Sequence, residues 1–152
     1  MSAGPVTTLP TPAIVLDTNI VLDLWVFSDP ATPPLAKVLE ERSVQWIATP
    51  PMREELLRVL DYAHLVAKMA YYRIESAEVL RRFDALVQIK AVAPKAAFVC
   101  KDSDDQKFID LAAAHQAMLI SKDKAVLCMT RRLERLGVAV YKAWPDTTPQ
   151  PI

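Results

Sequence analysis

The chain contains the segment Ala13-Ile14-Val15-Leu16-Asp17-Thr18-Asn19-Ile20, in which a carboxylate directly follows a short apolar run. A continuous apolar run of this length is typical of a strand that is buried on both faces, as in a parallel sheet. From Asn19 to Phe27 the pattern becomes helical. The segment therefore predicts a strand–helix junction at Asp17, and open parallel sheets form their binding sites at such strand ends.

The same alternation continues along the chain. Further strands are predicted at residues 44–48, 89–93, 117–120 and 138–141. Further helices are predicted at residues 33–42, 50–62, 66–72, 76–88, 103–116 and 124–136. Strands that alternate with helices form a parallel sheet covered on both faces. We therefore expect an α/β fold, a three-layer sandwich around a central parallel sheet of about four or five strands.

Local signals predict several helix ends. Pro50 suits the first position of a helix, with Thr49 as its N-cap. Ser103 and Gln106 fit a capping box, in which the glutamine side chain would reach back to the backbone of the serine. Gly137 is placed to end the helix predicted at 124–136.

The length and the ends of the chain indicate one domain. A length of 152 residues fits a single domain, and half of the twelve prolines lie in residues 1–12 and 145–152. We predict that these two segments are tails and that residues 13–144 form the domain. No apolar stretch is long enough to span a bilayer, and the N-terminus does not resemble a secretory signal. We expect a cytoplasmic protein with no membrane contact and with Cys100 and Cys128 as reduced, buried thiols.

Composition limits the kinds of binding site that the chain can form. The only glycines are Gly4 and Gly137, so a glycine-rich loop for nucleotide phosphates is excluded. The 18 basic and 18 acidic side chains balance, and a net charge of zero gives no global attraction to nucleic acid. A protein of this composition that binds nucleic acid would need bound metal and a local basic rim. The candidates for that rim are Arg53, Arg58, Lys101, Lys107, Lys122 and Lys124.

Acidic residues follow the predicted strand ends. Asp17 ends the first strand, and Asp123 follows the strand at 117–120. Asp102, Asp104 and Asp105 lie in a loop and at a helix start. Each aspartate is also in a position where it could simply cap a helix, which is the commoner role of an aspartate at a helix N-terminus.

Helix phase separates two of the acids from ordinary surface residues. Glu55 lies one turn after Met52 on the edge of an apolar stripe, and Asp105 lies one turn before Phe108 on a buried face. A carboxylate in such a place needs a partner, because burial of an unpaired charge is costly. Several converging carboxylates need a cation, and oxygen ligands suit Mg²⁺ or Mn²⁺. Such a site suits metal-assisted hydrolysis of a phosphodiester.

Four motifs, in order and at the usual spacing, resemble those of PIN-domain nucleases. They are IVLDTNI at residues 14–20, ELLRVL at 55–60, DSDDQKFIDLA at 102–112 and LISKD at 119–123. The resemblance covers roughly residues 14–141 and is closest to bacterial proteins described as toxin components of toxin–antitoxin systems. The chain differs from that subgroup at Ser103, where proline is frequent, and from the family motif at Ser121, where threonine is commoner.

The resemblance implies a function and a set of site residues. It implies a metal-dependent endoribonuclease with a Rossmann-like fold that cuts single-stranded RNA, using Mg²⁺ or Mn²⁺. It further implies a homodimer, bound by a small antitoxin protein. The metal-binding, catalytic acids would be Asp17, Glu55, Asp105 and Asp123. Polar support would come from Thr18, Asn19 and Ser121, and Asp102 or Asp104 could share the role of Asp105.

Other functions are compatible with parts of the pattern. A PIN-like module could bind RNA or an antitoxin with little or no catalysis, although acids at all four positions argue against it. A receiver-type signalling domain needs an aspartate after a central strand, and residues 47–50 supply none. A haloacid-dehalogenase-type phosphatase needs a second aspartate at position 19, which is Asn19 here.

Overall fold

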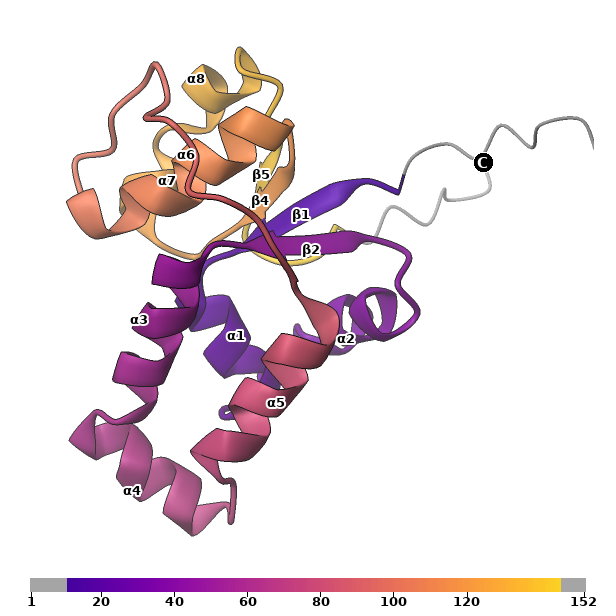
Figure 1. Cartoon of the computed structure of the whole chain (residues 1–152), viewed down its shortest axis with the longest axis vertical. Coiled ribbons are helices and arrows are strands. Elements are labelled where there is room, and N and C mark those ends of the chain that lie inside the picture. Colours follow the sequence, from indigo (N-terminus) through magenta and orange to yellow (C-terminus); the bar gives the residue numbers. More distant parts are fainter. Residues whose placement is uncertain (1–10, 146–152) are drawn as a thin grey trace, which may run out of the picture.

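The structure, a computed structural model, describes residues 11–145 and contains one five-stranded sheet (Figure 1). All neighbouring strands pair in parallel, in the order β3-β2-β1-β4-β5. The strands are β1 (Ala13–Leu16), β2 (Gln45–Ala48), β3 (Gln88–Ile89), β4 (Met118–Ile120) and β5 (Val140–Tyr141). The predicted parallel sheet of four or five strands is therefore confirmed.

Helices cover both faces of the sheet. Those of the first half are α1 (Thr18–Trp25), α2 (Pro33–Glu40), α3 (Pro50–Leu60), α4 (Ala63–Tyr71) and α5 (Ser76–Leu86). Those of the second half are the 3₁₀ helix η1 (Ser103–Asp105), then α6 (Gln106–His115), α7 (Lys124–Leu127) and α8 (Thr130–Glu134). Figure 1 shows the first group on one side of the sheet and the second group on the other, which confirms the three-layer sandwich.

The central strands are buried on both faces, as their unbroken apolar runs predict. Ile14 and Val15 of β1 are fully buried, and so is Leu119 of β4. The ring of Trp46, in β2, packs edge-on against the ring of Phe83, in α5, with ring centroids 5.2 Å apart. These contacts fix the strands against the helices and hold their carboxyl ends in place.

The strand order reverses at β1. The chain passes from β1 to β2 and β3 on one side, and then returns to β4 on the other side of β1. Leu16 is in register with Ile120, and the backbone N–H of Asp17 donates to the carbonyl of Ile120 at 3.0 Å. The residues that follow β1 and β4 therefore meet at one edge, where open α/β sheets bind their ligands.

The predicted helix at 124–136 is instead two short helices. Met129 leaves helical geometry with φ −96° and ψ 5°, and the hydroxyl of Thr130 donates to the carbonyl of Leu127 at 2.6 Å. A threonine hydroxyl that binds backbone in this way competes with the regular helix. Gly137 ends the pair as predicted, with φ +81°. A Cβ at this position would come within 2.9 Å of the Gln116 side chain.

Residues 90–102, which we call the strap, connect β3 to η1 and are held by two side chains of α6. Gln106 accepts a hydrogen bond from the Cys100 N–H at 2.6 Å and donates to the Phe98 carbonyl at 3.2 Å. Asp110 accepts from the Ala96 N–H and from Gln106, both at 2.8 Å. The predicted capping box is therefore wrong, because the Gln106 side chain contacts the strap and not Ser103.

Other expectations have mixed outcomes. Thr49 is the N-cap residue of α3 as predicted, but its side chain makes no capping hydrogen bond. Cys100 is buried as expected, whereas Cys128 is exposed, which corrects the prediction of two buried thiols.

Within residues 11–145, every helix is too short or too polar to cross a membrane. Most of the two predicted tails lies outside the described residues.

Candidate metal centre

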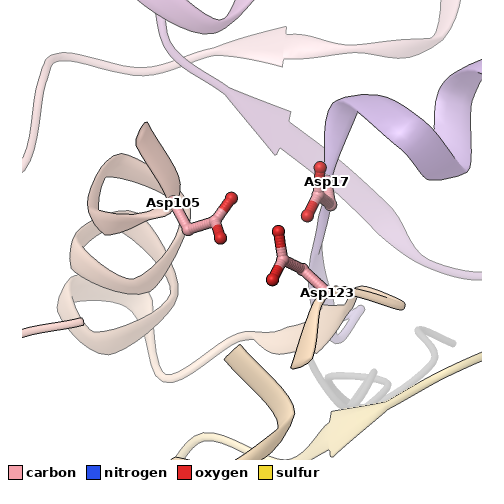
Figure 2. A group of neighbouring side chains, drawn as sticks. All are labelled: Asp17, Asp105 and Asp123. Carbon is pink, nitrogen blue, oxygen red and sulfur yellow. The ribbon is translucent and has the colours of Figure 1, made fainter. Parts of the chain in front are cut away.

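Three aspartates from separate parts of the sequence meet at the carboxyl edge of the sheet. One carboxylate oxygen each of Asp17, Asp105 and Asp123 lies within 4.8 Å of the other two. Asp17 follows β1, Asp123 follows β4, and Asp105 ends η1 at the start of α6. Figure 2 shows the three carboxylates pointing toward one another. This spacing is short enough for all three to bind one metal ion.

Hydrogen bonds orient Asp17, which is only 4% exposed. Its Oδ1 accepts from the backbone N–H of Asn19 at 3.2 Å, and its Oδ2 accepts from the hydroxyl of Ser121 at 2.8 Å. Burial raises the pKa of Asp17, and the nearby charges of Glu55 and Asp123 raise it further, against the effect of these hydrogen bonds. Each carboxylate oxygen has two lone pairs, so acceptor capacity for a cation remains.

Asp123 is positioned by its own helix and by Ser121. Its Oδ1 accepts from the Ala125 N–H at 2.9 Å, which makes it the N-cap of α7. Its backbone N–H donates to the hydroxyl oxygen of Ser121 at 3.1 Å. The fully buried Ser121 therefore links the two strand-end acids. Asp17 and Asp123 each cap a helix and also belong to the group of converging carboxylates. The two roles therefore do not exclude each other.

Asp105 carries the observation that points to a cation. It is 6% exposed, as its helix phase predicts, and within residues 11–145 its Oδ2 has no hydrogen-bond partner. Burial, a hydrogen bond with Asp123, and the charges of Asp17, Asp123 and Asp102 together raise the pKa of Asp105 to about 8. A buried carboxylate oxygen without a donor, facing two more carboxylates, fits a hard cation with oxygen ligands.

Glu55, the fourth predicted acid, lies beside this group with partners of its own. Its Oε2 accepts from the hydroxyl of Thr18, and its Oε1 accepts from Nζ of Lys107 at 2.9 Å. The side chain is 16% exposed, so the expectation that Glu55 needs a partner is confirmed. It is close enough for its charge to raise the pKa of Asp17. The structure thus joins three of the four acids directly and places the fourth next to them.

The remaining predicted site residues have minor contacts. Asp102 accepts from the Asp104 N–H at 3.0 Å, and its charge helps to raise the pKa of Asp105. Asp104 is exposed and contributes its backbone carbonyl to Lys107. Asn19 is also exposed and contributes its backbone N–H to Asp17. Of the three acids around η1, Asp105 is the one that belongs to the group of converging carboxylates. Figure 2 shows its carboxylate directed toward those of Asp17 and Asp123.

Ion pairs occupy half of the predicted basic rim. Arg53 forms two hydrogen bonds of 2.8 Å with Asp84, and Lys122 pairs with Asp23. Lys107 pairs with Glu55, a contact that the sequence did not predict. In the part of the chain that the structure describes, the rim side chains without an ion pair are Arg58, Lys101 and Lys124.

Sequence reasoning also missed the support behind the cluster. Gln106 and Asp110 hold the strap against the first turns of α6, directly after Asp105. Their spacing of four residues places them on one face of the helix, which was the available signal. The capping-box pattern of Ser103 and Gln106 predicts a different partner for Gln106.

Comparison with known proteins identifies a family. The family profile described as PIN domain matches residues 13–125, most of the chain. The matched range begins at β1 and ends just after Asp123, so it contains all four acids. A search of curated proteins finds no match.

Proposed function

The chain belongs to the PIN-domain family, and from this premise we propose that it is a metal-dependent endoribonuclease acting on single-stranded RNA. Members of this family are generally nucleases, and the chain carries an acidic cluster at the position that the fold uses for ligands. The observation that carries the proposal is the Asp105 carboxylate, which lies within 4.8 Å of those of Asp17 and Asp123 and whose buried Oδ2 has no hydrogen-bond partner within residues 11–145.

We propose Mg²⁺ or Mn²⁺ as the cofactor. The site consists of four acids, Asp17, Glu55, Asp105 and Asp123. The three aspartates hold the ion, and Glu55 adds a fourth carboxylate from α3. The cluster offers oxygen ligands, which hard divalent cations prefer over nitrogen or sulfur. When bound, such an ion compensates charge on the phosphodiester and acidifies water.

The protein's own residues prepare the site for hydrolysis. Ser121 and the Asn19 N–H fix the Asp17 carboxylate, and Ala125 fixes Asp123, so the ligands are oriented before substrate arrives. Because the pKa of Asp105 is raised, its carboxyl group has to lose a proton when a cation binds. The exposed Lys101 and Lys124 flank Asp102 and Asp123 in sequence, and we assign them to contacts with RNA phosphates.

We further propose that the protein is a homodimer and the toxin of a type II toxin–antitoxin pair, bound by a small antitoxin. The motif resemblance supports this role. Exposed apolar side chains on and around α3 and α4 supply a surface for a protein partner, namely Leu57, Tyr62, Val66, Tyr71 and Tyr72. Light scattering of the purified protein tests the dimer. Growth arrest on induction, relieved by Asp105→Asn, tests the toxin.

The nuclease proposal is tested by cleavage of an end-labelled single-stranded RNA with Mn²⁺, with Mg²⁺ and with a chelator. We expect metal-dependent cutting by the wild type and a loss of at least about a hundredfold in Asp17→Asn and Asp105→Asn. Asp61→Asn, an exposed acid at the end of α3, is the matched control and should retain full activity.

Circular dichroism must show that the variants remain folded. If the wild type does not cut, or if both variants cut as well as it does, the nuclease proposal is wrong. RNA binding without cutting would instead favour the alternative of a PIN-like binding module.

A further inference from the structure

One ammonium group lies inside the acidic site. Nζ of Lys107 donates to Oε1 of Glu55 at 2.9 Å and to the backbone carbonyl of Asp104. The side chain is 26% exposed, and its Nζ lies 4.9 Å from the centroid of the Phe108 ring. A carboxylate, a backbone carbonyl and an aromatic ring therefore all contact the Lys107 ammonium group.

The Lys107 ammonium group divides the site into two halves of different charge. In the Glu55 half, one oxygen accepts from Lys107 and the other from the hydroxyl of Thr18. In the aspartate half, three carboxylates converge, and one oxygen of Asp105 has no hydrogen-bond donor among the residues that the structure describes. The first half is already neutralised by the protein, whereas the second half needs a cation from solution.

Four carboxylates in one site are enough to hold two divalent ions, as in nucleases with two metals about 3.5–4 Å apart. A second ion here would bind between Asp17 and Glu55, whose charges already interact. It would have to displace the Lys107 ammonium from Glu55 and would then lie next to that positive charge. Both effects oppose its binding.

We propose that Lys107 takes the place of a second divalent ion, so that the protein binds a single ion in its three-aspartate half. Lys107 is thus a positioning residue, which acts through Glu55. This inference rests on the proposed function, because it concerns the same metal site.

The test counts Mn²⁺ ions bound per chain by equilibrium dialysis, without RNA and without any activity measurement. We expect one ion for the wild type and none at this site for Asp105→Asn. Lys107→Met, which keeps the length of the side chain and removes its charge, should raise the count to two. The added ion should appear in electron paramagnetic resonance as a spin-coupled Mn²⁺ pair.

Three variants control the assignment. Lys107→Arg keeps the charge and should stay at one ion, as should Lys101→Met, which removes an exposed lysine without an ion pair in residues 11–145. Combining Lys107→Met with Glu55→Gln should return the count to one, because the second ion would lose its carboxylate. Lys107→Gln repeats the test with a polar side chain, in case methionine disturbs the fold.

The outcomes separate this inference from the proposed function. Two ions in the wild type, or one ion in both Lys107→Met and Lys107→Gln, would overturn the role of Lys107 and leave the metal site in place. A wild type that binds no Mn²⁺ would overturn the proposed function, and the single-ion site with it.

Discussion

The hydroxyl of Ser121 donates a 2.8 Å hydrogen bond to Oδ2 of Asp17, joining residues 104 positions apart in the sequence. The hydroxyl oxygen of Ser121 also accepts from the backbone N–H of Asp123, so one fully buried side chain fixes the relative position of two acids. Removal of this hydroxyl takes one hydrogen bond from each acid and leaves Asp17 with the Asn19 N–H and Asp123 with the Ala125 N–H.

Ser121→Ala should therefore reduce RNA cleavage while the protein stays folded. Loss of a buried hydrogen bond to a charged group costs about 1.5–3 kcal/mol, which corresponds to a rate about ten- to a hundredfold lower. Ser121→Thr keeps the hydroxyl and should retain activity within about threefold of the wild type. Single-turnover cleavage rates measure both. Equal rates for the alanine variant and the wild type would show that Ser121 does not position the acids.

Asp105→Asn should stabilise the chelator-treated protein at pH 8. The folded-state pKa of Asp105 is about 8, above the ordinary value of 3.8. Between these values the folded chain holds a proton that the unfolded chain releases, so the stability of the wild type falls as pH rises through this window. Asparagine does not titrate, and we expect the variant to gain up to about 5 kcal/mol at pH 8 and little at pH 4.

Urea denaturation at several pH values measures this difference in the free energy of unfolding. Asp61→Asn, at an exposed position, should show no comparable gain. A difference between Asp105→Asn and wild type that does not change with pH would contradict the raised pKa.

Metal binding should release a proton. Below pH 8 the Asp105 carboxyl is protonated, and a cation binds only the ionised form. We expect about one proton released per Mn²⁺ ion at pH 7, and an apparent affinity that rises up to about tenfold per pH unit until pH 8. Isothermal titration calorimetry in buffers of different ionisation enthalpy counts the protons. Binding heats that do not depend on the buffer would rule out this coupling.

Asp110→Ala should loosen the strap. It removes the acceptor for the Ala96 N–H and for Gln106, and each lost partner leaves a donor unsatisfied. We expect a loss of about 1–3 kcal/mol in unfolding free energy. Hydrogen exchange at the Ala96 and Cys100 amides should accelerate at least about tenfold. Asp61→Ala serves as the surface control. Unchanged protection of both amides would show that Asp110 does not hold the strap.

The sheet and three of the acids were predictable because local patterns determine them. An unbroken apolar run followed by an acid predicted the positions of Asp17 and Asp123 at strand ends. Helix phase predicted the burial of Asp105, since Phe108 and Ile109 mark the core side of α6. These predictions need only the period of the helix and the rule for strand ends.

Contacts made by flexible polar side chains were not predictable. Lys107 and Glu55 are 52 residues apart, and nothing local in either helix favours this pair over an exposed position. Gln106 fits a capping box, yet its side chain binds the strap, which offers a carbonyl and an N–H at the same place. Two acceptable sets of partners existed, and tertiary structure decided between them.

The reversal of strand order has a consequence for the moment at which the three-aspartate cluster can form during synthesis. Asp17 leaves the ribosome more than a hundred residues before its partner strand β4 and Asp123. Every shorter nascent chain lacks Asp123 and the strand that positions it. The three carboxylates therefore cannot come together while the ribosome is still making the segment between β1 and β4.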